Sequence, residues 1–335
     1  MFKVGVDLGY GYTKIAAENS NRICFPSLVT KGQEIDMPDL LGAREDYIAT
    51  INGTTWYVGK MAAKENRLAT RAFDANERFN NGTFQTILAT ALAVSIPNGE
   101  DIMVVTGLPL SAFKDSQNSF LEFLKQYSAT VIIEGKEKNI SVKAAHVFPQ
   151  AAGIFVNPYC SHLKDALNPG DLVTVIDIGY RTTDVAVFEY TGSKYLFLAD
   201  NSFTIDTGMS TIFRSLGDIV ASDAGAFEVR LEVAEAIFSN GVGYINNKPM
   251  DYRDKIAELK ATVVNRIMDG YNLKGPKMEG QKGRNVPILA GGGSIPLNKE
   301  LLSAFPEAET IQDAQFANAV GFLEVGKRLD ISILD

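Results

Sequence analysis

The feature that most constrains this chain is a short segment that occurs twice, about half a chain apart. The first copy, Lys3–Ala16, reads KVGVDLGYGYTKIA, and the second, Val173–Phe188, reads VTVIDIGYRTTDVAVF. In each copy a mostly apolar run reaches an aspartate, a glycine follows two residues later, and a second apolar run begins after a polar tip. This pattern predicts a strand, a tight turn and a returning strand. A repeated hairpin of this kind is stronger evidence for a functional segment than either copy alone.

The two copies align residue by residue. An aspartate that leaves a buried strand beside a glycine-bearing turn suits phosphate and metal binding, because turn N–H groups bind phosphate while the carboxylate holds a hydrated cation. In the first copy Thr13 and Lys14 add a hydroxyl and an ammonium. The simpler interpretation is that Gly9 and Gly11 only form an ordinary hairpin turn. The alignment pairs Asp7 with Asp177, Gly9 with Gly179, Thr13 with Thr183 and Lys14 with Asp184.

Length and charge limit the alternatives. A chain of 335 residues is long enough for two domains, each with its own core. Its 32 basic and 40 acidic residues give a formal net charge of −8. An acidic surface opposes non-specific binding to nucleic acid, which requires an excess of Lys and Arg. We therefore expect no direct nucleic-acid partner.

Cysteine and histidine usage excludes other classes of site. Cys24 and Cys160 predict a reducing compartment and no disulfide framework. His146 and His162 lie apart from any cysteine or carboxylate cluster, so a zinc site is not expected. No apolar stretch is long enough to span a bilayer, and the first strand starts too early for a signal peptide or an amphipathic anchor. We expect a cytoplasmic protein without membrane contact.

Hydrophobic periodicity and turn residues predict the other elements. Residues 60–80 are expected to be irregular or partly helical, and Leu273–Asn285 to be an exposed loop. Ser111 is expected to cap a helix. The expected strands lie within residues 24–29, 46–51, 54–58, 101–108, 130–134, 138–145, 194–199 and 286–290, and the expected helices at 81–96, 111–127, 209–216, 226–239, 252–271 and 313–328. Small residues in the last helix, with Gly321 among them, predict a close crossing with Gln150–Val156.

Three further positions are candidates for chemistry. Gln150 follows a strand, and its neutral amide can hold an attacking water by donating and accepting at once; alternatively it only begins a helix. Gly208 precedes a helix and offers backbone donors to a ribose or phosphate, or simply caps that helix. The run Gly291–Ser294 follows a buried strand, where glycines let a ligand approach the backbone closely.

The order of these segments resembles the superfamily of actin, sugar kinases and DnaK-type chaperones. In that superfamily the two hairpins are the phosphate loops, the two small-residue helices connect the domains, and the glycine run is the adenosine loop. Within it, FPSLV at 25–29, WYVGKMA at 56–62 and TGLPLSAF at 106–113 resemble bacterial actin homologues of the ParM/StbA type, which segregate low-copy plasmids. The match is weakest at Tyr180-Arg181, where the second phosphate loop is usually small and often glycine-rich.

The resemblance implies an α/β fold of two RNase H-like (actin-like) domains around a central nucleotide cleft. Domain I is expected at residues 1–155 with 318–335, carrying an insertion at about 30–80. Domain II is expected at 156–317, with an outer lobe at about 215–275. The implied ligands are ATP or GTP and Mg²⁺, which Asp7 and Asp177 would hold through water. The implied nucleotide contacts are Gly9, Gly11, Tyr12, Thr13, Lys14, Gly179, Arg181, Thr182, Thr183, Gly208, Gly291, Gly292, Gly293 and Ser294.

The function implied is an actin-like ATPase that forms nucleotide-dependent filaments, with Gln150, Asp177 and Asp7 as its catalytic residues. The expected partners are further copies of this chain, arranged head to tail, and a DNA-binding adaptor protein. A small-molecule kinase of the same superfamily is the alternative. A kinase requires a carboxylate base near the γ-phosphate, and Asp206 is the nearest to a candidate that the sequence offers. A third alternative is a module that binds nucleotide without polymerising.

Overall fold

The computed structural model describes residues 1–18, 22–32, 46–65, 69–71, 81–160, 166–277 and 283–331. The chain divides into two compact units. Unit 1 comprises Met1–Lys164 and Gln315–Asp335, and unit 2 comprises Asp165–Ala314. Among the described residues, no helix is both long and apolar enough to cross a membrane. Parts of the segments predicted at 60–80 and 273–285, together with His162, lie outside the described residues.

Unit 1 is built on one mixed sheet with the strand order β3-β2-β1-β8-β10-β9-β5-β6-β4-β7. β1 pairs antiparallel with β2 and parallel with β8, which in turn pairs parallel with β10. The strands are β1 (Phe2–Leu8), β2 (Tyr12–Ala17), β3 (Ile23–Pro26), β4 (Leu28–Lys31), β5 (Tyr47–Ile51), β6 (Thr54–Val58), β7 (Thr70–Arg71), β8 (Ile102–Leu108), β9 (Ser128–Ile133) and β10 (Lys136–Pro149).

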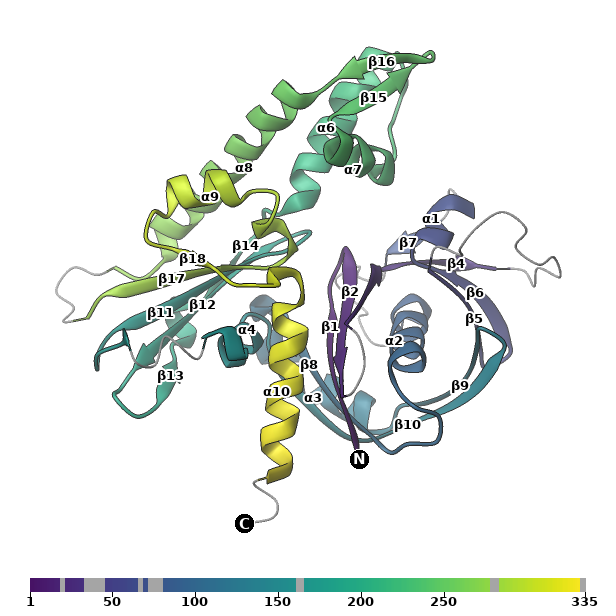
Figure 1. Cartoon of the computed structure of the whole chain (residues 1–335), viewed down its shortest axis with the longest axis vertical. Helices are drawn as coiled ribbons and strands as arrows, with labels where there is room; N and C mark the ends of the chain where they lie inside the picture. The colour runs from purple at the N-terminus through teal and green to yellow at the C-terminus, as the bar shows by residue number, and fades with distance from the viewer. Residues whose placement is uncertain are drawn as a thin grey trace. The chain divides into compact units, whose positions relative to one another are not determined.

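The sheet of unit 1 curls around helix α2 (Gly82–Ser95), as Figure 1 shows. Phe84, Ile87 and Leu92 are among the α2 side chains buried in the core of this unit. A helix that is apolar on all sides must be enclosed, and the curled sheet provides that enclosure. Helix α3 (Leu110–Lys125) lies on the same side, where Phe120 meets Phe84 edge to face. A short helix, α1 (Lys60–Glu65), follows β6.

The predicted cap of α3 is wrong. Helix α3 begins at Leu110, so Ser111 lies inside its first turn, and no side chain caps the helix. The residue at the cap position is Pro109, whose carbonyl oxygen accepts hydrogen bonds from the N–H groups of Ala112 and Phe113 at 2.9 and 3.0 Å. The fixed φ of proline lets the helix start there without a side-chain cap.

The other face of the unit 1 sheet is covered by α10 (Ala317–Ile331), which a 3₁₀ turn, η4 (Ala314–Phe316), precedes. A Cβ added to Gly5 of β1 would lie 2.1 Å from the carbonyl oxygen of Ala319. One added to Gly321 would lie 1.7 Å from the carbonyl oxygen of Gly153, in α4 (Ala152–Val156). The predicted close crossing of these two helices is therefore confirmed. Helix α4 starts two residues later than predicted, so Gln150 lies in a turn.

Unit 2 is built on a sheet with the order β13-β12-β11-β17-β18, in which β14 also pairs with β12. One face is covered by α6, α8 and α9, whose buried residues pack on Ile176 and Ile178. The strands are β11 (Leu172–Ile178), β12 (Thr183–Tyr190), β13 (Tyr195–Phe197), β14 (Phe203–Ile205), β17 (Asn285–Ala290) and β18 (Glu309–Thr310). The helices are α6 (Met209–Ala224), α7 (Leu231–Asn240), α8 (Arg253–Lys274) and α9 (Asn298–Ala304).

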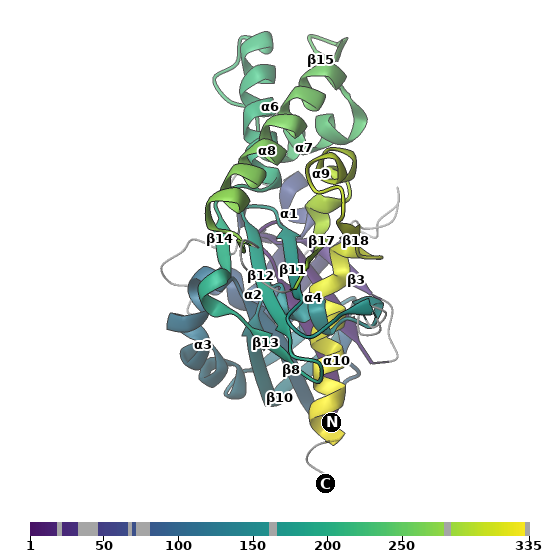
Figure 2. The same ribbon diagram turned by 90° about the vertical axis from the view of Figure 1, so that its left-hand side faces the viewer.

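An outer lobe projects from one end of the unit 2 sheet (Figure 2). It contains most of α6 and α8, with α7 and a hairpin of β15 (Val242–Ile245) and β16 (Lys248–Asp251). The sequence analysis missed this hairpin, whose Asn246-Asn247 turn has positive φ at both residues. It also missed α9 and β18. These elements are short, and short elements carry little periodicity.

The sheets of the two units repeat one plan. The register Asp7↔Lys14 and Leu8↔Thr13 in the first hairpin matches Asp177↔Asp184 and Ile178↔Thr183 in the second. The order β3-β2-β1-β8-β10 in unit 1 corresponds to β14-β12-β11-β17-β18 in unit 2. The repeated hairpin is therefore confirmed, and so is the α/β class with two similarly built halves.

Two helical glycines provide a matched test of the close packing of α10 on α4. Gly321→Ala should lower the free energy of unfolding by about 1–3 kcal/mol or more, because the new methyl group collides with backbone that has no room to move. Gly217→Ala in α6 is the control. Its Cβ would meet nothing closer than 3.5 Å, so the better helix propensity of alanine should raise stability by roughly 0.5–1 kcal/mol. Urea unfolding followed by circular dichroism measures both. Equal stability of Gly321→Ala and the parent chain would contradict the packing.

Candidate functional site

The Asp7 carboxylate is the centre of a polar network in unit 1. Asp7 is the penultimate residue of β1 and is 5% exposed. The Lys14 ammonium lies 3.0 Å from Oδ2, and the Gln150 amide nitrogen donates to Oδ1 at 3.2 Å. Lys14 reaches Asp7 because the two residues are directly paired in the hairpin. One carboxylate thus binds both an ammonium and an amide.

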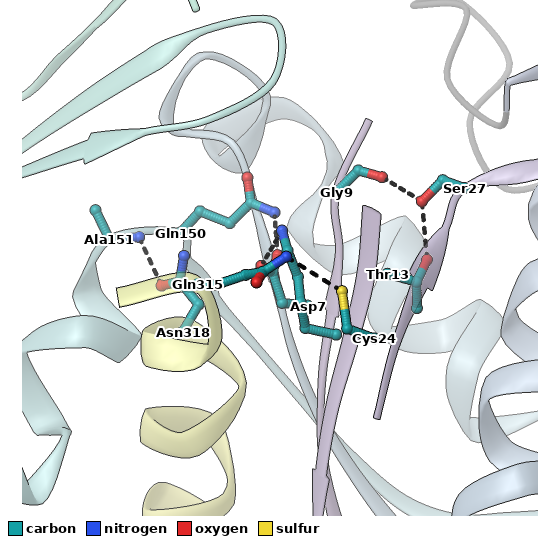
Figure 3. Close-up of polar contacts among 10 residues, drawn as sticks. Asp7, Gly9, Thr13, Cys24, Ser27, Gln150, Ala151, Gln315 and Asn318 are labelled. Atoms are coloured by element: carbon teal, nitrogen blue, oxygen red, sulfur yellow. Dashed lines mark hydrogen bonds and ion pairs between the residues drawn. The ribbon is translucent and has the colours of Figure 1, made fainter. Parts of the chain in front are cut away.

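This network orients the Gln150 side chain. The amide nitrogen points to Asp7, and the carbonyl oxygen points away from it (Figure 3). A carboxylate only accepts hydrogen bonds, so it selects the nitrogen end of the amide. The backbone of Gln150 is held as well, because its N–H donates to the carbonyl oxygen of Leu108 at 2.7 Å. The amide oxygen therefore keeps its acceptor capacity on the side away from Asp7.

Ser27 fixes the tip of the first hairpin, a role that the sequence analysis did not assign. Its hydroxyl donates to the carbonyl oxygen of Gly9 at 2.7 Å and lies 2.9 Å from the Thr13 hydroxyl (Figure 3). Because a serine hydroxyl has one proton, the Thr13 hydroxyl must donate to Ser27. The Ser27 N–H also donates to the carbonyl oxygen of Gly11 at 2.9 Å. Ser27 thus connects three residues of the tip.

The equivalent position in unit 2 is Thr207. The Thr183 hydroxyl donates to the Thr207 carbonyl oxygen at 2.8 Å, just as Thr13 donates to Ser27. Both acceptors lie two residues beyond the partner of the threonine in the neighbouring strand. In the sequence, Ser27 stands out only as part of the FPS segment. Its role at the tip becomes visible only once β2 is seen to pair with β3. Both threonine hydroxyls hold neighbouring backbone or side chains in this structure.

Cys24 lies directly opposite Lys14 in the β2–β3 pairing. Burial raises the pKa of its thiol to about 11, an effect that the nearby Lys14 ammonium only partly offsets. The Gln315 amide nitrogen lies 3.3 Å from the sulfur (Figure 3). The thiol is therefore protonated at neutral pH, and it is a neutral neighbour of the network rather than a nucleophile.

In unit 2, Asp177 lies against the glycine run. A Cβ on Gly291 would lie 2.2 Å from the Asp177 carboxylate oxygen Oδ1, and the φ of Gly291 is +81°. Only glycine fits this position, because a side chain would both collide and be strained. The Ser294 hydroxyl donates to the Gly291 carbonyl oxygen at 2.8 Å and holds the loop closed. The structure thus brings together the aspartate and the glycine loop that the sequence analysis singled out separately.

The charge opposite the aspartate differs between the two hairpins. Asp7 faces Lys14, whereas Asp177 faces Asp184. Asp184 is 4% exposed and accepts a hydrogen bond from the Thr204 hydroxyl. Paired residues of antiparallel strands lie on one face, so two carboxylates stand next to each other in unit 2. This arrangement favours a cation that can neutralise them.

The tip of the second hairpin is tied to helix α6. The N–H groups of Met209 and Ser210 donate to the carbonyl oxygens of Gly179 and Tyr180 at 3.1 and 2.6 Å. Gly208 has extended backbone, and a Cβ there would lie 2.8 Å from the Gly179 carbonyl oxygen. Two of the backbone donors at this helix start are therefore used by the tip. A ribose contact at Gly208 stays a prediction.

Arg181 lies at the tip of the second hairpin. Its side chain is 41% exposed, and it lies 3.8 Å from the carboxylate of Asp206, which is 82% exposed. Thr182 accepts the Gly179 N–H at 2.9 Å through its carbonyl oxygen, which closes the turn. An exposed pair of this kind contributes little to stability. It leaves the guanidinium accessible to solvent.

The predicted site residues divide between the two units. Unit 1 contains Asp7, Gly9, Gly11, Tyr12, Thr13, Lys14 and Gln150. Unit 2 contains Asp177, Gly179, Arg181, Thr182, Thr183, Gly208, Gly291, Gly292, Gly293 and Ser294. Within the described part of the chain, no three His, Cys, Asp or Glu side chains form a metal-binding group.

Comparison with known families gives two matches that together span most of the chain. Residues 5–153 match the family model described as the N-terminal domain of actin-like proteins. Residues 175–303 match the model described as the C-terminal part of an archaeal, MreB-like actin homologue. An archaeal actin homolog of Thermoplasma volcanium is 25% identical over 339 residues, covering 98% of this chain and 99% of that protein.

Solved structures share the whole fold. A 15-stranded ParM filament from Clostridium botulinum superimposes with a TM-score of 0.88 at 24% identity, covering 98% of this chain and 99% of that one. An archaeal actin homolog in complex with ADP superimposes with a TM-score of 0.78 at 23% identity, covering 98% of this chain and all of the other. The predicted two-domain, actin-like α/β fold is therefore confirmed.

Ser27→Ala tests the hydrogen bonds at the first hairpin tip. Losing the hydroxyl leaves the carbonyl oxygen of Gly9 without this donor, which should lower the free energy of unfolding by about 1–3 kcal/mol. Amide hydrogen exchange in the peptide that spans the tip should accelerate. Ser95→Ala is the control, because it removes a buried hydroxyl bonded to the α2 backbone of the same unit. Unchanged exchange at the tip in Ser27→Ala would show that Ser27 does not hold it.

Proposed function

Since the chain belongs to the actin-like proteins, we propose that it hydrolyses ATP or GTP with Mg²⁺ and assembles into nucleotide-dependent filaments. The observation that carries this proposal is the pair of acidic hairpins with matching register. Each ends at a glycine turn beside an aspartate, which suits a phosphate and its cation. A related archaeal actin homolog binds ADP in its solved structure, which supports a nucleotide as the ligand.

The residues of both hairpins fit a hydrated magnesium ion. Mg²⁺ prefers oxygen ligands and retains several of its waters, so one or two carboxylates are enough to hold it. Asp177 suits this role best, because Asp184 beside it adds negative charge and Gly291 leaves its oxygen close to bare backbone. Asp7 already binds Lys14 and Gln150. Asp7 is therefore the weaker of the two candidates for holding a hydrated ion.

Hydrolysis requires a positioned water rather than a covalent intermediate. Gln150 suits this role because Asp7 fixes its amide nitrogen and leaves the amide oxygen to accept a hydrogen bond from the attacking water. Lys14 would stabilise the developing phosphate charge. Bound magnesium would neutralise the phosphate oxygens, and the protein residues would hold and orient the nucleotide. Gly9 and Gly11 would supply backbone donors, whereas the Gly179 N–H already closes its own turn on the carbonyl oxygen of Thr182.

Filament assembly follows from head-to-tail contacts between identical subunits, which do not close into a ring. A ParM protein of the same fold forms filaments in its solved structure. We propose that nucleotide binding promotes assembly and that hydrolysis destabilises the filament. Plasmid segregation is the cellular role that this implies. The net charge of −8 favours contact with DNA through a separate adaptor protein.

A small-molecule kinase remains the second candidate. It needs a carboxylate base aimed at a substrate hydroxyl, and Asp206 was the sequence candidate. The Asp206 side chain is 82% exposed and lies near Arg181. A carboxylate this exposed is not held in position to aim at a substrate hydroxyl, so this observation favours hydrolysis over transfer.

Sedimentation with ATP, GTP, ADP and a non-hydrolysable analogue tests the proposed function. We expect pelleting with a triphosphate and Mg²⁺, no pelleting with ADP, and stable pellets with the analogue. Electron microscopy of the pellet should show filaments, and phosphate release should accompany assembly. Absence of pelleting with every nucleotide, together with phosphate transfer to an added sugar or acid, would favour the kinase.

Asp177→Ala and Asp7→Ala test the metal assignment. Asp177→Ala should abolish magnesium-dependent phosphate release, because it removes the carboxylate best placed for the cation. Asp7→Ala should also impair turnover, partly through the loss of the contact that orients Gln150. Asp206→Ala is the control and should retain activity. Parent-like turnover and parent-like magnesium dependence in Asp177→Ala would exclude the assigned role.

A further inference from the structure

A left-handed turn directly follows Gln150. The backbone of Ala151 has φ 70° and ψ −29°, in the region that L-amino acids with a Cβ rarely adopt. The side chain of Ala151 is fully buried. Such a backbone conformation is unfavourable and persists only where the surroundings hold it in place. The surroundings of Ala151 therefore decide how firmly the turn is set.

The side chain of Asn318, in α10, holds the turn at Ala151 in place. Its side-chain oxygen Oδ1 accepts the Ala151 N–H at 3.1 Å (Figure 3). Asn318 is 5% exposed, so water does not compete with the bond. The preceding N–H, that of Gln150, donates to Leu108. The backbone around Gln150 is thus held on both sides, by a strand end and by a side chain from a helix far along the sequence.

By fixing the backbone turn, these hydrogen bonds also fix the position of the Gln150 amide. The side chain of Gln150 leaves the backbone between the two held N–H groups and ends on the Asp7 carboxylate at 3.2 Å. If Ala151 relaxed to an ordinary φ, the Gln150 Cα–Cβ bond would turn and the amide would lose this geometry. We propose that Asn318 is a positioning residue for Gln150, setting the direction of the amide that orients the attacking water. This proposal rests on the hydrolytic function proposed above.

The neighbouring Asn157 provides a matched comparison. Its side-chain nitrogen donates to the carbonyl oxygen of Ala317 at 3.2 Å, and it is 2% exposed. It therefore joins the α4 segment to α10, as Asn318 does, but this bond to Ala317 does not involve the Ala151 turn. A general contribution of this helix contact to stability would be lost in either variant. A positioning role would appear in Asn318→Ala alone.

Single-turnover phosphate release and nucleotide affinity test the proposal. Asn318→Ala should slow hydrolysis roughly 10- to 100-fold, as misplacement of a catalytic group by about 1 Å does, with little change in nucleotide affinity. Asn157→Ala should hydrolyse at the parent rate. In a Gln150→Ala background, Asn318→Ala should slow hydrolysis no further, because both substitutions remove the same function.

A second measurement does not depend on activity. The side-chain amide signal of Gln150 in a ¹⁵N NMR spectrum, assigned by its loss in Gln150→Ala, should move in Asn318→Ala and stay in place in Asn157→Ala. If Asn318→Ala does not fold, Ala151→Gly with Asn318→Ala should restore folding, because glycine adopts this φ freely. Its hydrolysis should remain slow, since the turn is no longer held.

Two outcomes overturn the positioning role while leaving the hydrolase intact. One is parent-like hydrolysis and an unmoved Gln150 signal in Asn318→Ala. The other is an equal further loss of rate when Asn318→Ala is added to Gln150→Ala. If the parent chain itself releases no phosphate from any nucleotide, the proposed function fails instead, and the catalytic role of Asn318 fails with it.

Discussion

Both units depend on one constraint, a buried strand that ends in an aspartate where a neighbouring strand offers glycine. In unit 2 the constraint is direct, because the Asp177 carboxylate and Gly291 leave no room for a Cβ between them. In unit 1 the strand next to β1 carries Gly107, where a Cβ would lie 2.5 Å from the Phe322 ring and 3.1 Å from Gln150. The Asp7 carboxylate can stay buried because Lys14 and Gln150 bind it, and the half-buried Asp177 carboxylate lies against bare backbone. The strand order, the hairpin turns and the helix crossings all serve this arrangement.

The two hairpins share geometry but differ in charge, and that difference separates their proposed roles. Lys14 neutralises Asp7 internally, so the first hairpin already has a cation that can bind phosphate. Asp184 adds a second negative charge beside Asp177, so the second hairpin carries excess negative charge that a divalent cation can neutralise. The same hairpin plan with opposite charges at one paired position thus gives the two hairpins different electrostatics. The Thr13 and Thr183 hydroxyls have a structural role, because each bonds a residue next to its hairpin. The charged groups perform the chemistry that we propose.

The sequence predicted most of the sheet because the repeat fixes a register, and register fixes which residues are neighbours. The Asp7 and Asp177 hairpins, the α2 core helix and the glycine crossing of α10 on α4 all followed from local patterns. Ser27 did not, because its role depends on pairing between β2 and β3, which no local pattern specifies. The left-handed turn at Ala151 was missed for the same reason, as alanine gives no sign of positive φ. Ser111 was misplaced because its serine was a stronger local signal than the proline that starts the helix.

Helix α10 connects these local and distant features. Gly5, Gly107, Gly153 and Gly321 remove every Cβ that would keep the helix away from β1, β8 and α4. This close approach is what allows a side chain as short as asparagine to reach the Ala151 N–H. A side chain at any of these glycines would collide with backbone or side chains at the contacts of α10 with β1, β8 and α4. The small residues of α10 therefore act on the candidate site through Asn318. Its contact with the Ala151 N–H links the packing of the last helix to the direction of the Gln150 amide.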